Sequence, residues 1–214
     1  MAELAESKPV LHYWGVKSRT HAINYLLGYN GLANQVTLKQ DIGYPGTPEF
    51  AQNPSSKLGQ LPFLQDGEVQ LGQSGAIFAY LAKKFNIGQD LSLADYAKSE
   101  ELIAQAADVF AILAKAHYGE DRTAAMDAAF AGQIAKTLTA FEPCVTDSGF
   151  FCTTASPGDL AFASVLNLLT CLEPGVLTSF PKLAAFDALI QANEGIQAAN
   201  AVSPYMYFKR KSDE

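Results

Sequence analysis

The segment GQLPFLQDGEVQLGQSGAI, residues 59–77, contains the strongest structural signals in the chain. Two short apolar runs, LPFLQ and EVQL, flank an Asp-Gly pair at positions 66–67, which tolerates positive φ and is typical of a tight β-hairpin turn. A helical pattern follows the second run directly. The polar groups of the segment are therefore mostly backbone amides, with the side chains of Gln60, Gln73 and Ser74 beside them. Such a surface suits a small peptide-like or anionic ligand.

Two features of this segment indicate where a ligand binds. Leu61-Pro62 is an X-Pro bond between a long connector and a strand, and a cis peptide there turns the backbone of Leu61 outward to pair with an extended ligand. The alternative is a trans Pro that only begins a strand. Ser74 is predicted to be the N-cap of the next helix, where a ligand carboxylate gains free N–H donors and the helix dipole. The alternative is a cap without a ligand.

The first 85 residues have the hydrophobic pattern of an α/β domain. KPVLHYW is typical of a strand, a helix is expected from its N-cap Ser18 until Gly28 and Gly31 end it, and QVTLKQ is a second candidate strand. The connector DIGYPGTPEFAQNPSSKLG follows, and loops of this length are usually functional or contain short helical turns. The order β-α-β, connector, β-β-α predicts one four-stranded mixed sheet with helices packed against it.

The second half of the chain repeats apolar residues at intervals of three and four, which predicts an all-α domain of four to six helices. Within it, SPGDLAF has a capping signature, in which Ser156 bonds the amide three residues on and Asp159 is favoured by the positive helix start. We therefore expect an α/β domain at residues 1–85, a linker at 86–91 and a helical domain at 92–214.

Composition narrows the classes of function. The 214 residues carry a formal net charge of −7, which argues against nucleic acid, whose binding depends on clusters of Lys and Arg. The three cysteines lack the spacing of a metal or redox site, and we interpret them as reduced, mostly packed thiols; the three histidines are too scattered for a metal triad. Because no apolar run reaches the roughly 18 residues of a membrane span and no signal peptide is recognisable, we expect a soluble cytoplasmic protein without metal or membrane partners.

A third element, LHYWGVKSRTHAINYLLG, places Tyr13 at the end of the first strand and Arg19 six residues later. Together with residues 59–77, which look much like the glutathione-binding segment of the pi and sigma classes, it resembles the cytosolic glutathione transferases of the tyrosine type, the sigma, pi, mu and alpha classes. The resemblance covers nearly the whole chain and is closest to sigma or pi. It implies a thioredoxin-like N-terminal domain, an all-helical C-terminal domain, a homodimer, and glutathione as co-substrate along the sheet edge.

The resemblance also implies roles for individual residues. Tyr13 falls on the family's catalytic tyrosine, whose phenolic O–H stabilises the thiolate of glutathione, and Arg19 adds positive potential. A cysteine thiol, with a pKa of about 8.5, is mostly protonated at neutral pH, whereas the thiolate is the nucleophile. The residues expected to bind glutathione are Tyr13, Phe50, Asn53, Lys57, Gln60, Leu61, Pro62, Gln73 and Ser74. The residues expected to bind the acceptor are Trp14, Ala111, Ile112, Lys115 and Tyr205.

Three functions stay open at this point. The leading hypothesis is conjugation of glutathione to small, electrophilic, apolar acceptors in a cleft between the domains. The resemblance to the sigma class also implies a glutathione-dependent isomerase of the prostaglandin-synthase kind. The third is a non-catalytic, crystallin-like structural protein. Two departures from the family pattern favour it mildly: Asn53 aligns with a lysine that commonly contacts the glycine end of glutathione, and Gln105 aligns with an acidic residue that usually reaches the glutathione of the partner subunit. The intact Tyr13 and Arg19 favour an enzyme.

Overall fold

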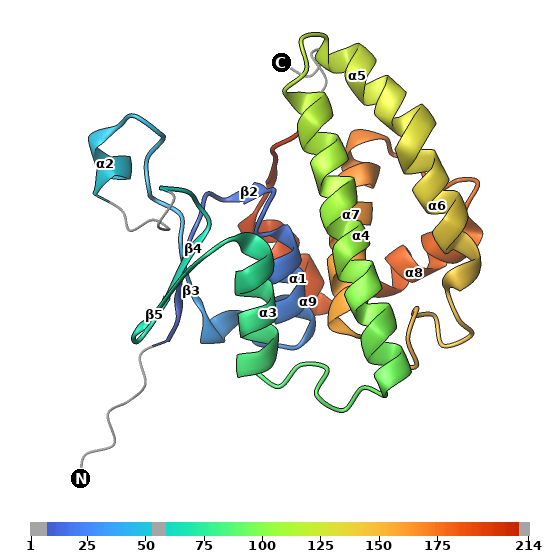
Figure 1. The fold of residues 1–214 in the computed structure, drawn as a ribbon, viewed down its shortest axis with the longest axis horizontal. Helices are drawn as coiled ribbons and strands as arrows, with labels where there is room; N and C mark the ends of the chain where they lie inside the picture. Colours follow the sequence, from blue (N-terminus) through green and yellow to red (C-terminus); the bar gives the residue numbers. More distant parts are fainter. Residues whose placement is uncertain (1–7, 53–58, 210–214) are drawn as a thin grey trace.

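The computed structural model describes residues 8–52 and 59–209 of the chain. Its first elements are β1 (Val10–His12), β2 (Val16–Lys17), α1 (His21–Tyr29), η1 (Ala33–Gln35), β3 (Thr37–Lys39), α2 (Pro48–Ala51), β4 (Phe63–Asp66), β5 (Val69–Gly72) and α3 (Ser74–Lys84). Strands β3, β1, β4 and β5 form one sheet in that order, with β1 parallel to β3 and antiparallel to β4 (Figure 1). The four-stranded mixed sheet and the element order expected from the sequence are therefore confirmed.

The predicted hairpin joins β4 to β5 and is fixed to α3. Its turn contains Gly67 at φ +56°, a conformation that glycine adopts without the steric cost of a side chain. The Asp66 carboxylate at the end of β4 accepts a hydrogen bond from the Tyr80 hydroxyl at 2.7 Å and forms an ion pair with the Lys84 ammonium at 2.7 Å. These contacts hold the hairpin against α3, which orients the junction between β5 and the start of α3.

Helix α1 begins later than the sequence suggested. It starts at His21 with Thr20 as N-cap, and no side chain caps it, so the prediction that Ser18 is the N-cap is wrong. The carbonyl of Ser18 instead accepts a hydrogen bond from the backbone of His21 at 2.9 Å. Gly28 does not end α1 but lies inside it, because a Cβ there would come within 2.5 Å of the carbonyl oxygen of Gly195, where another helix crosses.

The second half of the described chain is helical, as predicted. Its elements are α4 (Leu93–His117), α5 (Arg122–Ala129), the π-helical η2 (Phe130–Ile134), α6 (Ala135–Phe141), η3 (Glu142–Cys144), α7 (Pro157–Leu172), α8 (Pro181–Gln191), α9 (Glu194–Val202) and the short strand β6 (Tyr205–Met206). In Figure 1, α1 and α3 lie between the sheet and these helices, whereas α2 projects away from them. Helix α1 packs against both α7 and α9. None of the helices in the described residues combines the length and apolarity needed to span a membrane.

Helix α7 is the most deeply buried helix of the second half and begins with the predicted capping box. The Asp159 backbone N–H donates to the Ser156 hydroxyl oxygen at 3.2 Å, and the Ser156 backbone N–H donates to the Asp159 carboxylate at 3.0 Å. Gly158 lies against α4 so closely that a Cβ would be 2.3 Å from the Ser99 carbonyl oxygen. The start of α7 is therefore fixed by both a local cap and a tight helix crossing.

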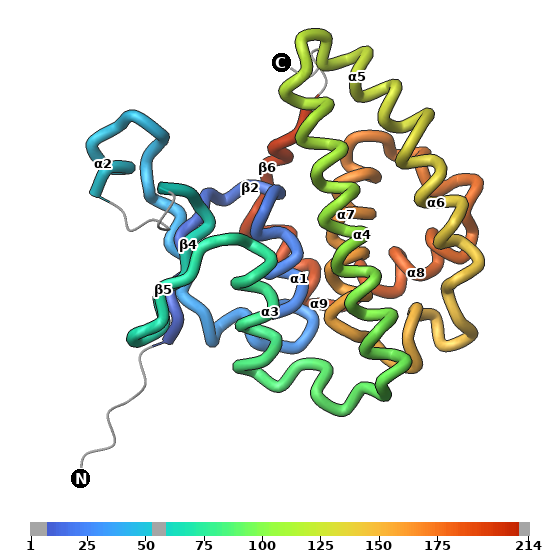
Figure 2. The backbone as a smooth tube through the Cα atoms, viewed as in Figure 1, coloured from blue at the N-terminus to red at the C-terminus, as the bar shows by residue number. Residues whose placement is uncertain are grey.

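The sequence analysis did not anticipate strand β6. It pairs in parallel with β2, with Val16 opposite Tyr205 and Lys17 opposite Met206 (Figure 2). This pair joins the segment that follows β1 to the C-terminal segment of the described chain. It therefore brings residues 205–208 next to the end of β1, where Tyr13 lies.

Candidate active site at the sheet edge

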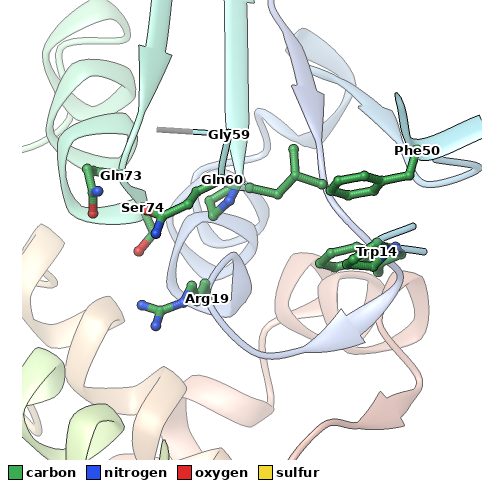
Figure 3. A pocket seen from close by; sticks show the side chains of 10 residues that line it. Trp14, Arg19, Phe50, Gly59, Gln60, Gln73 and Ser74 are labelled. Carbon is green, nitrogen blue, oxygen red and sulfur yellow. The ribbon is translucent and has the colours of Figure 1, made fainter. Parts of the chain in front are cut away.

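A cavity of about 310 Å³, which we call the edge cavity, lies between the C-terminal end of β1, the start of β4 and the start of α3 (Figure 3). Six of the residues predicted to bind glutathione line it: Phe50, Gln60, Leu61, Pro62, Gln73 and Ser74. The sequence analysis did not select Pro45 and Gly59, which also line it. Asn53 and Lys57 lie outside the described residues. Figure 3 shows Gln73 and Ser74 at one end of the cavity and Phe50 at the other, with Gln60 between them.

The peptide bond between Leu61 and Pro62 is cis, as anticipated. Pro62 is buried and Leu61 is half-buried, immediately before β4. Both residues line the edge cavity, so the backbone around Leu61 lies at the surface that an extended ligand meets.

The junction between β5 and α3 differs from the expectation in one respect. Ser74 is the first helical residue rather than the N-cap, and the N-cap is Gln73, at φ 68° and ψ 115°. A non-glycine residue in this region costs about 1–3 kcal/mol and is frequently found at functional sites. The first turn of α3 contains no acidic residue, so its free N–H groups and positive dipole end are not neutralised by the helix itself. This end of the edge cavity is suited to a carboxylate.

Trp14 forms the opposite end together with the segment around α2. Its indole Nε1–H donates to the Gly43 carbonyl oxygen at 2.6 Å. Its ring is nearly parallel to those of Phe50 and Tyr44, at interplanar angles of 6° and 12°. Trp14 therefore holds the α2 segment beside the edge cavity, and it also lines that cavity itself.

Tyr13 is buried, with 7% of its surface exposed, and its hydroxyl has a defined polar environment. Burial raises the pKa of Tyr13 above its ordinary value, and the nearby Ser18 hydroxyl, Arg19 backbone N–H and Arg19 charge offset only part of that rise. At neutral pH the phenol is thus protonated, and a protonated phenol can donate a hydrogen bond to a ligand atom.

A second cavity, of about 180 Å³, opens at the phenol, and we call it the tyrosine cavity. It shares Trp14, Arg19 and Leu61 with the edge cavity, so the two spaces are adjacent at these residues. Its other lining residues are Tyr13, Ser18, Phe110, Ala114, Tyr118, Tyr207 and Phe208. Tyr13, which was also predicted to bind glutathione, lines this second cavity but not the edge cavity.

The structure places some of the predicted acceptor residues in the lining of the tyrosine cavity and others outside it. Trp14 lines it, whereas Ile112, Lys115 and Tyr205 are not among its lining residues. Phe110 and Ala114 of α4 and its C-cap Tyr118 face the cavity, and they recur at the four-residue spacing of one helix face. That spacing was visible in the sequence, but nothing in the sequence indicated which face of α4 is turned toward Tyr13.

Ala111 lines a third space, the helical cavity, of about 330 Å³ between α1, α3, α4 and α7. Its lining is mostly apolar, and Arg19 is its only charged residue. Arg19 lines all three cavities, and its guanidinium lies 5.2 Å from the centre of the Phe110 ring. None of the carboxylates in the described residues forms an ion pair with Arg19, so its charge is available to a ligand.

The cysteines and acidic residues are also candidate metal ligands. In residues 8–52 and 59–209, no three His, Cys, Asp or Glu side chains are grouped as metal ligands. Cys144, Cys152 and Cys171 are free thiols, but only Cys152 is buried, so the prediction that they are mostly packed is wrong for the other two.

Comparison with known families identifies this arrangement. The sequence model described as "Glutathione S-transferase, N-terminal domain" matches residues 9–83, and that described as "Glutathione S-transferase, C-terminal domain" matches residues 107–201. The chain belongs to the glutathione S-transferase family. The predicted family, the enzyme class and the fold class, a thioredoxin-like domain followed by a helical domain, are thereby confirmed.

Individual glutathione S-transferases are similar over most of the chain. Glutathione S-transferase Mu 1 of Bos taurus is 28% identical over 208 residues, which are 94% of this chain and 91% of the bovine protein. Glutathione S-transferase Mu 4 of Homo sapiens is 28% identical over 195 residues, 88% of each chain. Glutathione S-transferase 2 of Gallus gallus is 38% identical over 82 residues, 36% of this chain and 37% of the chicken protein. The expected closeness to the sigma or pi class is not confirmed by these relatives.

Proposed function

We propose that this glutathione S-transferase binds glutathione in the edge cavity and uses Tyr13 to stabilise its thiolate for conjugation to small, electrophilic, apolar acceptors in the tyrosine cavity. One observation carries the proposal. Tyr13 is a protonated phenol that lines the tyrosine cavity, and this cavity shares Trp14, Arg19 and Leu61 with the edge cavity. Its O–H is therefore assigned as the donor to the sulfur of a tripeptide that extends from the edge cavity toward the acceptor.

The edge cavity offers complementary groups along the length of glutathione. The α-carboxylate of the γ-glutamyl end is assigned to the start of α3, where Ser74 supplies a free N–H and Gln73 an exposed amide. The cysteinyl backbone is assigned to Leu61, and Gln60 flanks it. The glycine end then lies toward Phe50. This orientation leaves the cysteinyl sulfur directed at the tyrosine cavity.

The chemical step asks little of the protein beyond stabilising the sulfur anion. The thiol loses its proton to solvent, the phenolic O–H of Tyr13 donates to the sulfur, and the sulfur electron pair forms a bond to the electrophilic carbon of the acceptor. In a substitution, the leaving group departs with its bonding electrons. In an addition, the electron pair displaced within the acceptor is protonated. Lowering a thiol pKa by about two units needs about 2.7 kcal/mol. A charge-assisted hydrogen bond supplies most of that, and the uncompensated charge of Arg19 adds to it.

The class proposed is tyrosine-type, which includes the mu class of the two mammalian relatives as well as the sigma and pi classes. We also propose a homodimer, which the family resemblance implies. A sedimentation measurement tests it, because a dimer has twice the 22.9 kDa mass of the single chain.

The test is a titration of glutathione into the native protein and into Tyr13→Phe, with thiolate ultraviolet absorbance recorded against pH and the heat of binding measured in parallel. The native protein is expected to bind glutathione with a thiol pKa about two units below the free value. Tyr13→Phe is expected to bind it with most of that shift lost. Tyr25→Phe is the control, since it removes another buried phenol that lines neither cavity. An unchanged thiol pKa in Tyr13→Phe contradicts the assignment of Tyr13, and absence of binding contradicts the site.

A further inference from the structure

The segment that carries Ser18 and Arg19, which line the tyrosine cavity together with Tyr13, is held at both ends by one side chain from the other domain. Residues 18 and 19 lie between Lys17 and His21, and both of these flanking residues contact Asn167 of α7. The Lys17 ammonium donates to the Asn167 Oδ1 at 3.2 Å, and the His21 Nε2 is 3.0 Å from the same oxygen. One amide oxygen therefore holds the segment at both of its ends.

The contact to His21 has a defined protonation state. His21 is 1% exposed, and burial lowers its pKa to about 3. The imidazole is therefore neutral at physiological pH, and it needs its proton on Nε2 to donate to Asn167 Oδ1. The other ring nitrogen, Nδ1, is buried and has no hydrogen-bond partner within the described residues. The hydrogen bond to Asn167 is the one polar contact that fixes the orientation of this ring.

The start of α1 has no side-chain cap within the described residues. Its N-cap, Thr20, makes no side-chain capping bond, and the first turn contains no acidic residue. Within the segment, the Ser18 carbonyl accepts from the backbone of His21, which fixes the turn but not its position relative to Tyr13. Lys17 makes a second contact with α7, where its ammonium lies 3.7 Å from the Cys171 sulfur. The position of the segment thus depends on α7.

We propose that Asn167 is a positioning residue for catalysis: by binding Lys17 and His21 it places Ser18 and Arg19 beside Tyr13, with which they line the tyrosine cavity. The inference rests on the proposed role of Tyr13 in thiolate formation. Asn167 lines neither the edge cavity nor the tyrosine cavity, so it acts through the segment rather than by touching glutathione or the acceptor.

The expected consequence is a change in chemistry without a change in glutathione binding. In Asn167→Leu the side-chain volume is nearly kept, but the His21 N–H and the Lys17 ammonium lose their acceptor, and an unsatisfied buried donor is costly enough to make the segment shift. With Ser18 and Arg19 displaced, the phenol is a weaker hydrogen-bond donor. We expect the pKa of enzyme-bound glutathione to rise by about half a unit to one unit, which lowers kcat at pH 6.5 about two- to fivefold, because the native thiol is then about half ionised. The KM for glutathione is expected to change less than about twofold, because the edge cavity is untouched.

Asn200→Leu is the matched control. Asn200 is also half-buried and also contacts α1, where its Oδ1 accepts from the Tyr25 hydroxyl at 3.3 Å, but it lies away from Tyr13. A purely structural effect of losing an amide contact to α1 appears in both variants, whereas a positioning effect appears only in Asn167→Leu. Lys17→Met is the second variant, in case Asn167→Leu does not fold, since it removes one of the two anchors and leaves the buried contact intact.

Two readouts separate this proposal from the proposed function. The first is the fluorine spectrum of protein labelled with 3-fluorotyrosine, in which the signal of Tyr13 among the nine tyrosines is identified by its absence in Tyr13→Phe. It reports on the phenol without any substrate. The second is the thiol pKa of bound glutathione.

A displaced Tyr13 signal in Asn167→Leu or Lys17→Met, with the native position kept in Asn200→Leu, supports the proposal, and return of the signal in Asn167→Asp, which restores an acceptor oxygen, strengthens it. An unmoved Tyr13 signal in both of the first two variants overturns it. A displaced signal combined with a thiol pKa that is unshifted even in the native enzyme keeps the positioning role and refutes the thiolate role of Tyr13.

Discussion

His21 makes the stability of the protein sensitive to mild acid. Its imidazole is 1% exposed at the interface of α1 and α7, and burial lowers its pKa from 6.5 to about 3. In the unfolded chain the same side chain titrates near 6.5. Between these two values the unfolded state binds a proton that the folded state does not, so acidification favours unfolding.

The size of the effect follows from the two pKa values. Above pH 6.5 His21 is neutral in both states, and its contribution to the free energy of unfolding is complete. Below that pH, stability falls by about 1.4 kcal/mol per pH unit until the folded pKa is reached. At pH 4.5 the expected loss from this single residue is about 2.7 kcal/mol, which is a large part of the roughly 5–15 kcal/mol that stabilises a typical domain.

The assay is urea unfolding, followed by circular dichroism, of the native protein and of His21→Gln at several pH values between 7.5 and 4.5. Glutamine keeps an N–H donor that reaches toward Asn167 but does not titrate. His12, whose pKa is also lowered by burial, and the carboxylates titrate in both proteins, so their contributions cancel in the difference. The variant is expected to be less stable at pH 7.5 and to lose that disadvantage as the pH falls. Parallel pH profiles for the two proteins refute the reasoning, because they show that His21 binds the same number of protons in both states.

Three further changes test how the fold supports the site. Each is measured by urea unfolding, and the third also by the KM for glutathione. Gly158→Ala is expected to destabilise the protein by at least about 2 kcal/mol, because the new Cβ meets the Ser99 backbone at 2.3 Å and backbone atoms cannot yield as a side chain can. Ser156→Ala is expected to cost about 2 kcal/mol, since it removes the cap of α7 and a hydroxyl that lies 2.6 Å from the buried Asp159 carboxylate; an effect below about 0.5 kcal/mol contradicts this. Gln73→Gly is expected to keep or raise stability by relieving the strain at φ 68°, while the KM for glutathione rises about tenfold as the amide contact is lost; equal KM values contradict the role of Gln73.

Local patterns were sufficient to predict the framework of the edge cavity. The hairpin was identified from the glycine turn between two apolar runs, and the cis bond at Leu61-Pro62 was suspected from its place before a strand. The capping box of α7 was identified from four consecutive residues. Each of these features is determined by neighbours in the sequence, so its signal is contained within a short segment.

The errors occur where a residue serves a distant contact instead of its local pattern. Ser18 has the side chain of an N-cap and precedes a helical pattern, yet it lines the tyrosine cavity beside Tyr13 and the helix begins three residues later. Gly28 is a helix breaker by propensity, but it lies within α1 because the carbonyl of Gly195 requires the space. In the same way, Tyr207 rather than Tyr205 lines the tyrosine cavity, and the pairing of β6 with β2 that brings it there is not visible in either strand alone.

The same reasoning explains why Tyr13 is recognisable from sequence while the environment that tunes it is not. Tyr13 directly follows β1, and the pattern of that strand places it at the edge of the sheet. Asn167 positions the segment that carries Ser18 and Arg19, and it lies 146 positions from His21 in the sequence. Such a contact cannot be predicted from the periodicity of the sequence, because each partner fits its own helical pattern whether or not the other is present. The walls of the tyrosine cavity likewise come from α4 and the segment after β6. The thiol pKa and the choice of acceptor are therefore properties of the domain interface, and substitutions there alter both while every residue of the edge cavity is retained.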